Sequence, residues 1–213
     1  MKDQLSFANQ KIAIFIAFVC AALLASVLIF HMRNHSFVTP LTKDEGLLFP
    51  AARDIGTFEL TIDDRSFTQK DFLGHWTLLL FGFAHCSNVC PITLNMLGHI
   101  YDQLHIALPN LQVVFVSLDP DRDTIEKISR YAHSFHPKFM GVTGRVQELH
   151  KLQAQLGVIS IQDKISSSHY ELQHTSSIML INPQAKWAGL FKFGQAPQTF
   201  SNIIRISIAY LSK

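Results

Sequence analysis

Apolar residues gather in short runs along the chain, and polar stretches with helical spacing separate them. Residues 76–84 (WTLLLFGFA) and 111–119 (LQVVFVSLD) are two largely apolar runs. This pattern is typical of strands buried on both faces of a sheet. After the first run, segment 92–108 repeats apolar residues with helical spacing, at Leu94, Leu97, Tyr101 and Leu104. The pattern predicts a buried strand, then a helix that Pro91 can begin, then a second buried strand.

Further strands and helices are predicted before and after this strand–helix–strand segment. Before it, a short hairpin is predicted to turn at Asp63-Asp64. After it, a helix is predicted to start at Asp123, with Glu126 as its capping-box partner. Further predicted elements are a short strand or turn at 139–144 and a helix at 146–157, which Gly157 ends. Two strands at 175–182 and 186–193, joined at Asn182-Pro183, and a last helix at 196–211 follow. Alternating strands and helices predict an α/β fold with a central mixed sheet flanked by helices.

The N-terminal region has a different pattern. Residues 12–30 carry no charge and are flanked by Lys11 and Arg33. As a helix this run would span roughly 28 Å, close to the thickness of a membrane's hydrocarbon core. It is longer than the apolar region of a cleavable signal peptide usually is, so we expect one transmembrane anchor. We therefore divide the chain into a tail (1–11), an anchor (12–30), a linker (31–55) and a folded domain (56–213).

Composition and charge exclude some classes of protein. The formal net charge is +2, and no basic stripe follows the chain, so we expect no nucleic-acid partner. The 17 phenylalanines supply a substantial core, and three cysteines are too few for a disulfide-stapled scaffold. Lys2 and Lys11 precede the anchor while Arg33 and Lys43 follow it, so charge does not decide its orientation.

Cys86 and Cys90 are the candidate chemical groups, because they follow the end of a buried strand and begin a helix. A helix N-terminus favours the thiolate, which is both the nucleophilic and the metal-binding form. Helical spacing puts Cβ atoms four residues apart about 5 to 6 Å from each other, whereas a disulfide needs about 3.5 to 4.5 Å. A metal bonded to both sulfurs fits this spacing with less distortion, and it would need a third ligand from elsewhere.

Three separated stretches carry a resemblance to known proteins, namely FGFAHCSNVCPITL, VVFVSLDPDRDT and YELQHTSSIMLINPQAKW. They resemble the Sco/SenC family of membrane-anchored copper proteins, and the resemblance covers most of residues 55–210. It implies a thioredoxin-like fold and a copper ion bound by Cys86, Cys90 and His174. Two thiolates and an imidazole suit Cu(I) and Cu(II), but zinc fits them equally well, so only the resemblance favours copper.

The resemblance also implies a function and a location. The family delivers copper to the binuclear centre in subunit II of cytochrome c oxidase, or keeps the thiols of that subunit reduced. Its domain faces the periplasm from the bacterial inner membrane, or the intermembrane space from the mitochondrial inner membrane. Other copper carriers and thiol reductants are further expected partners. This chain departs from the family pattern at Ser87, Asn88 and Gln173, where the family usually has Pro-Asp between the cysteines and an acidic residue before the histidine.

Other residues near these stretches have alternative interpretations. His85 and His169 are rival imidazole ligands, with His85 more suited to a supporting or exposed position. His133 and His136 lie near a predicted helix end, where a surface role is expected. Asp119 is a candidate for the site entrance, whereas capping is the expected role of Asp123.

A second hypothesis makes the protein a membrane-anchored thiol–disulfide oxidoreductase with Cys86 and Cys90 as its redox pair. Thioredoxin-type catalysts usually carry a Cys-x-x-Cys pair facing a cis-proline. The corresponding stretch here, QHTSS, has no proline and offers His174 instead, which favours a metal site. A peroxidase is a third, weaker hypothesis. Such an enzyme needs an activating arginine and a resolving arrangement near a single cysteine, and neither is evident around Cys86.

Overall fold

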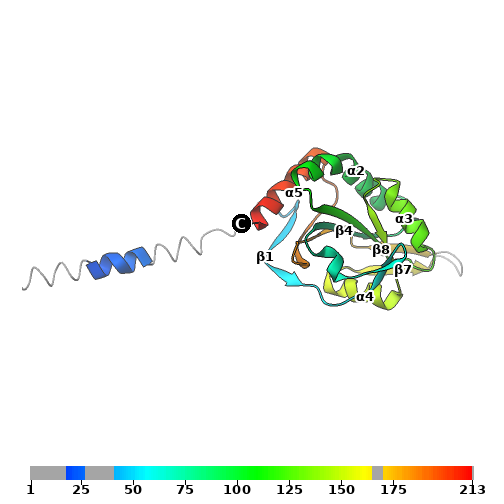
Figure 1. Cartoon of the computed structure of the whole chain (residues 1–213), viewed down its shortest axis with the longest axis horizontal. Helices are drawn as coiled ribbons and strands as arrows, with labels where there is room; N and C mark the ends of the chain where they lie inside the picture. Colours follow the sequence, from blue (N-terminus) through cyan, green and yellow to red (C-terminus); the bar gives the residue numbers. More distant parts are fainter. Residues whose placement is uncertain (1–17, 27–40, 165–169, 213) are drawn as a thin grey trace, which may run out of the picture. The chain divides into compact units, whose positions relative to one another are not determined.

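The computed structural model describes residues 18–26, 41–164 and 170–212. Residues 40–213 form one compact unit, which Figure 1 shows as a sheet with helices on both faces. The predicted anchor, residues 12–30, lies mostly outside the described residues, although 18–26 are helical. Within the described ranges, no helix combines the length and apolar character that crossing a membrane requires.

Six strands form the central sheet, in the order β1-β10-β9-β4-β5-β6. They are β1 (Gly46–Asp54), β4 (Trp76–Gly82), β5 (Leu111–Ser117), β6 (Met140–Val142), β9 (Ile178–Ile181) and β10 (Lys186–Phe191). Strands β4, β5 and β6 pair in parallel, whereas β1, β10 and β9 pair antiparallel, and β9 also pairs antiparallel with β4. The sheet is therefore mixed, and the predicted α/β class is confirmed.

Alternating side chains of the sheet build two separate cores. Leu78 and Leu80 of β4 face one core, while Leu79 and Phe81 face the other, as the two-residue period of a strand requires. The helices over the first core are α2 (Val89–Ala107), α3 (Ile125–His133) and α5 (Pro197–Leu211). The second core is covered by α4 (Val146–Gln155), the strands β2 (Leu60–Ile62) and β3 (Arg65–Phe67), and the 3-10 helix η1 (Gln69–Phe72). Figure 1 shows α4 on the opposite side from α2, α3 and α5.

Three sequence-based predictions need correction. The predicted linker, 31–55, extends too far, because residues 46–54 form β1, and Leu48 there is buried. Helix α3 is capped by Thr124, whose hydroxyl accepts from the Lys127 N–H, and not by Asp123. The third correction concerns an omission, because no element was predicted between Gly157 and Thr175. There β7 (Ser160–Lys164) and β8 (Tyr170–His174) pair as a separate two-stranded sheet.

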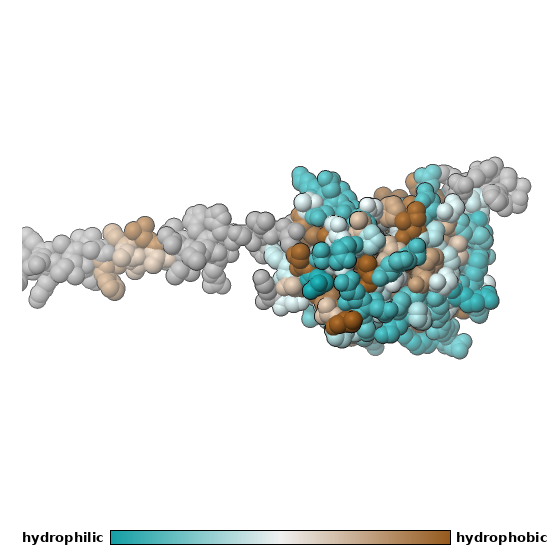
Figure 2. Space-filling view, turned by 90° about the horizontal axis from the view of Figure 1, so that it is seen from above, coloured by the Kyte–Doolittle hydropathy of each residue, from teal (hydrophilic) through white to brown (hydrophobic). Residues whose placement is uncertain are grey.

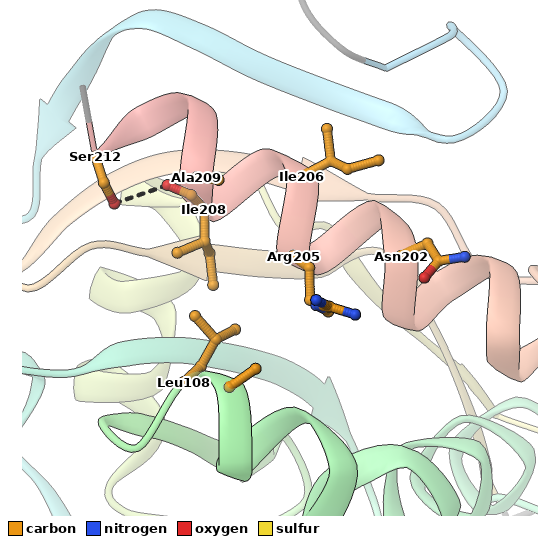
Figure 3. A pocket seen from close by; sticks show the side chains of 8 residues that line it. Leu108, Asn202, Arg205, Ile206, Ile208, Ala209 and Ser212 are labelled. Atoms are coloured by element: carbon orange, nitrogen blue, oxygen red, sulfur yellow. Dashed lines mark hydrogen bonds between the residues drawn. The ribbon is translucent and has the colours of Figure 1, made fainter.

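The face of the domain that Figure 2 shows is mostly hydrophilic, with separate hydrophobic spots. One groove of about 640 Å³ lies where α5 passes the C-terminal end of α2 (Figure 3). Its walls include Leu108, Arg205, Ile206 and Ala209. Since α2 rises about 1.5 Å per residue, this groove lies roughly 25 Å from the start of the helix, where Cys90 is found.

Candidate metal centre

Cys86, Cys90 and His174 come together in the folded domain. One potential ligand atom from each, two Sγ atoms and an imidazole nitrogen, all lie within 4.8 Å of one another. The Cys90 Sγ to His174 Nε2 distance is 3.6 Å. Among the residues that the structure describes, this is the one cluster of three or more His, Cys, Asp or Glu side chains close enough to hold a metal ion.

The two cysteines lie in the segment that joins β4 to α2. Cys86 is in the loop, where its N–H donates to the Phe83 carbonyl, and Cys90 is buried in the first turn of α2. A side chain at Gly82 would leave no room for this arrangement. Its Cβ would lie 2.6 Å from Cys90 Sγ and 2.7 Å from the Phe115 ring. Glycine at the end of β4 therefore lets the helix start close to the sheet.

The buried carboxylate of Asp123 holds this cysteine loop in place through hydrogen bonds. Asp123 is 0% exposed, and its Oδ2 accepts from the Ala84 N–H at 2.8 Å and from the Ser117 hydroxyl at 2.7 Å. Its Oδ1 pairs with Lys127 Nζ at 3.1 Å. Asp123 therefore ties the end of β4 to the segment after β5, which is a different role from the predicted cap.

His174 is supplied by the hairpin β7–β8 and not by the central sheet. Its Nδ1 lies 2.9 Å from the Thr175 carbonyl, which only accepts, so Nδ1 carries the proton and Nε2 presents its lone pair. The ring packs edge-on against Phe83. Burial lowers the pKa of His174, and the Thr175 hydrogen bond opposes this. The imidazole is therefore neutral at neutral pH, which is the form that binds metals.

Burial acts against ionisation of Cys90. It raises the pKa of the Cys90 thiol, and the neighbouring Cys86 thiol adds to the rise. For Cys90 the prediction of a lowered pKa at the helix start is therefore wrong in the metal-free protein. A bound cation would favour the thiolate, so metal binding at this site would release protons. Both cysteines are free and form no disulfide with each other.

A pocket of about 380 Å³ opens beside Cys86, and its walls include Phe83, Arg122, Tyr170 and Leu172. Asp119, the predicted entrance residue, is buried at 3% exposure behind this wall. Its Oδ1 accepts from the Tyr170 hydroxyl and its Oδ2 from Arg122 Nε, each at 2.5 Å. Burial raises the pKa of Tyr170 to about 12, and the hydrogen bond to Asp119 adds to the rise, so the hydroxyl stays a donor.

Sequence reasoning missed Tyr170 and Arg122 as neighbours of the centre. A usable signal was the spacing of Tyr170 and His174, because residues four apart in a strand lie on the same face. The other candidates lie elsewhere or outside the description. His85 is half exposed and contacts Lys127 Nζ at 3.3 Å, His136 pairs with Asp102, and His133 is exposed. His169 lies outside the described residues.

Comparison with known proteins assigns the chain to a family. A family model described as SCO1/SenC matches residues 50–209. The chain belongs to the SCO1/SenC family. The "Protein SCO2 homolog, mitochondrial" of Danio rerio is 38% identical over 128 residues, which are 58% of this chain and 44% of the relative. The Homo sapiens protein of the same name is 31% identical over 148 residues, which are 68% of this chain and 56% of the relative. The chain thus spans about half the length of these curated relatives.

A solved family structure shows the same architecture. The crystal structure of Arabidopsis thaliana ScoI with copper bound matches with a TM-score of 0.68 and 28% identity, covering 73% of this chain and 98% of that one. The likeness confirms the thioredoxin-like α/β fold that the sequence resemblance implied. Within that fold, the hairpin β7–β8 brings an imidazole to the start of α2.

Proposed function

We propose that the protein is a copper-binding assembly factor that holds one copper ion between Cys86, Cys90 and His174. The observation that carries the proposal is the approach of three ligand atoms to within 4.8 Å of one another, on segments far apart in sequence. The Arabidopsis relative with copper bound supports copper over zinc as the ion. Soft thiolates select Cu(I), and an added imidazole also accommodates Cu(II).

We further propose that the copper is delivered to subunit II of cytochrome c oxidase, or that the cysteines keep the thiols of that subunit reduced. In the second case Cys86 and Cys90 would reduce a disulfide of the subunit to two thiols and would themselves become a disulfide. Three protein donors leave a copper ion open to a further ligand, which a thiolate of an acceptor can supply. The pocket beside Cys86 gives such a ligand access from one side. Copper would then pass by ligand exchange, with each incoming thiolate replacing one outgoing donor.

The proposed location is a membrane surface. Residues 12–30 would act as the anchor, with the domain in the periplasm of a bacterium or in the mitochondrial intermembrane space. The uncharged run of about 19 residues supports this proposal, because its helical length suits a bilayer. The vertebrate relatives are named as mitochondrial proteins, which supports the second alternative.

A thiol–disulfide oxidoreductase is the second candidate function. It is favoured by the short distance between two free cysteines, whose sulfurs lie within 4.8 Å. It is disfavoured by the backbone, since the described part of the chain has no cis peptide bond of the kind that faces the redox pair in thioredoxin-type catalysts. At this place the chain has His174, the last residue of β8, followed by Thr175.

Copper titration of the reduced full-length protein in detergent tests the proposal. We expect about one equivalent of Cu(II) to bind, with a thiolate-to-copper charge-transfer band. The double substitution Cys86→Ala/Cys90→Ala should abolish both the band and tight binding. Cys20→Ala is the matched control, because this cysteine belongs to the N-terminal segment, and it should change neither. Binding that persists without Cys86 and Cys90 would refute the proposal.

A further inference from the structure

The hairpin that carries His174 is attached to the domain at both of its ends. At its base, Ser160 pairs with His174, and Gln153 of α4 donates to the Ser160 hydroxyl at 2.8 Å. At its other end, Lys164 pairs with Tyr170. The hairpin forms a two-stranded sheet of its own, so no backbone ladder of the central sheet fixes its position. Side-chain contacts at its two ends therefore add to its chain connections with α4 and β9 in holding it.

The contacts at the Tyr170 end are polar and converge on one carboxylate. The Tyr170 hydroxyl donates to Asp119 Oδ1, and Arg122 Nε donates to Oδ2 of the same aspartate. Arg122 also donates from Nη1 to the Tyr170 carbonyl at 3.2 Å, and its guanidinium lies 3.7 Å from the centre of the Tyr170 ring. Charge-assisted hydrogen bonds of this kind are about twice as strong as neutral ones. They therefore fasten β8 to the segment between β5 and α3.

The same segment also holds the cysteine loop. Asp123 accepts from the Ala84 N–H, and the Leu118 N–H donates to the Gly82 carbonyl at 2.8 Å. Within the segment, the N–H groups of Arg122 and Asp123 both donate to the Asp119 carbonyl. One short connection, 118–124, thus contacts both of the segments that supply the metal ligands.

Tyr170 and His174 lie four residues apart on β8, so their side chains project from the same face of the strand. We infer that Tyr170 is a positioning residue for the metal centre, whose hydroxyl holds the hairpin through Asp119 so that His174 Nε2 stays beside the two sulfurs. This inference rests on the proposed copper site. Without the hydroxyl, the cysteine side keeps its geometry, whereas the hairpin gains freedom and the imidazole is offered to the ion for less of the time.

The substitution Tyr170→Phe tests the inference, because it removes the hydroxyl and keeps the ring under Arg122. We expect Cu(II) affinity to fall about 10-fold, as is usual when a residue that orients a ligand is lost. Electron paramagnetic resonance should show weakened or heterogeneous nitrogen coupling, while one copper still binds. Tyr101→Phe is the matched control. Its buried hydroxyl donates to the Leu111 carbonyl at 3.0 Å, away from the cysteines, so it should lower stability without changing the copper signal.

A double-mutant cycle with His174→Ala identifies the route of the effect. If Tyr170 acts through His174, then Tyr170→Phe should cause no further loss of affinity once the imidazole is gone. An equal loss in both backgrounds would overturn the inference, and so would an unchanged affinity and nitrogen signal in Tyr170→Phe. Failure of the proposed function would look different, because the wild-type protein itself would then lack thiolate and nitrogen ligation.

Discussion

The two sides of the candidate metal centre are built in different ways. Cys86 and Cys90 follow β4, a central strand with all seven residues buried, and Cys90, in the first turn of α2, packs into the core. His174 lies on a hairpin outside the central sheet, and polar side chains hold that hairpin in place. Close packing tolerates few alternative positions, whereas the position of the hairpin depends on a few polar contacts that single substitutions can remove.

This difference suits a protein that must both hold and release an ion. The sulfur pair stays close together with or without the imidazole, because the core fixes the loop that carries it. The position of the imidazole depends instead on the polar contacts of the hairpin. We therefore expect substitutions on the cysteine side to affect folding first, and substitutions on the hairpin side to affect metal binding first.

The largest expected effect is on the cysteine side, from Asp123→Asn. The amide keeps the shape of the carboxylate but removes the charge that faces Lys127 and weakens acceptance from Ala84 and Ser117. We expect the free energy of unfolding to fall by about 3 kcal/mol, because the buried side chain loses two hydrogen bonds to a charged acceptor. Urea denaturation measures this change.

The matched control for this substitution is Asp102→Asn. The Asp102 side chain is 82% exposed and pairs with His136 at 3.2 Å. Surface ion pairs contribute little, so the change should stay within about 0.5 kcal/mol. Equal effects of the two substitutions would mean that the cysteine loop does not depend on its buried carboxylate.

An intermediate effect is expected on the hairpin side, from His174→Ala. Copper affinity should fall by about 10- to 100-fold, which corresponds to roughly 1.4 to 2.8 kcal/mol of binding free energy. The free energy of unfolding of the metal-free protein should change by less than about 1 kcal/mol, since His174 lies outside both cores. Competition with a copper chelator and urea denaturation measure the two quantities.

His85→Ala is the control for the imidazole. It removes a histidine adjacent in sequence to Cys86 whose ring contacts Lys127. Copper affinity should therefore stay unchanged, and the Cys86–Cys90 disulfide should still form on oxidation in both variants. If His85→Ala weakened copper binding as much as His174→Ala, the third ligand would have been assigned to the wrong residue.

The sequence predicted the elements of this comparison unequally. Strands β4 and β5 were predictable because burial on both faces demands continuous apolar residues. Strand β1 escaped prediction, since it contains Pro50 and its pairing with β10 is irregular between Leu48 and Arg53. Strands β7 and β8 were not predicted either, for a different reason. Their sequences, SIQDK and YELQH, are polar because the hairpin lies outside the central sheet.

The three candidate metal ligands were also predictable to unequal degrees. Spacing and position at a strand end pointed to Cys86 and Cys90, since both signals are local. His174 is 84 residues from Cys90, and only the family resemblance selected it among 11 histidines. The role of Asp123 was out of reach, because a helix cap and a buried carboxylate just before a helix look alike in sequence. Which of them forms depends on Ala84 and Ser117, which belong to other segments.

The smallest expected effect comes from a departure from the family pattern, at Asn88. This residue is the N-cap of α2, yet its side chain makes no capping hydrogen bond. Asn88→Asp would add a negative charge at the positive end of the helix dipole and near the bound cation. We expect about 0.5 kcal/mol of added stability and about threefold tighter copper binding at low salt. Chelator competition at two ionic strengths measures the second effect.

Two controls show whether the gain in copper affinity is electrostatic. One is measurement at high salt, and the other is an aspartate substitution at a second position. Screening by high salt should remove most of the gain, because Asn88 is exposed to solvent. Asn95→Asp adds the same charge at an exposed position two turns further along α2, and it should change copper affinity less. An equal gain from both aspartates would mean that net charge matters and proximity does not. No gain at Asn88 at low salt would mean that the rigid cysteine side already determines copper affinity, leaving only the hairpin side to adjust it.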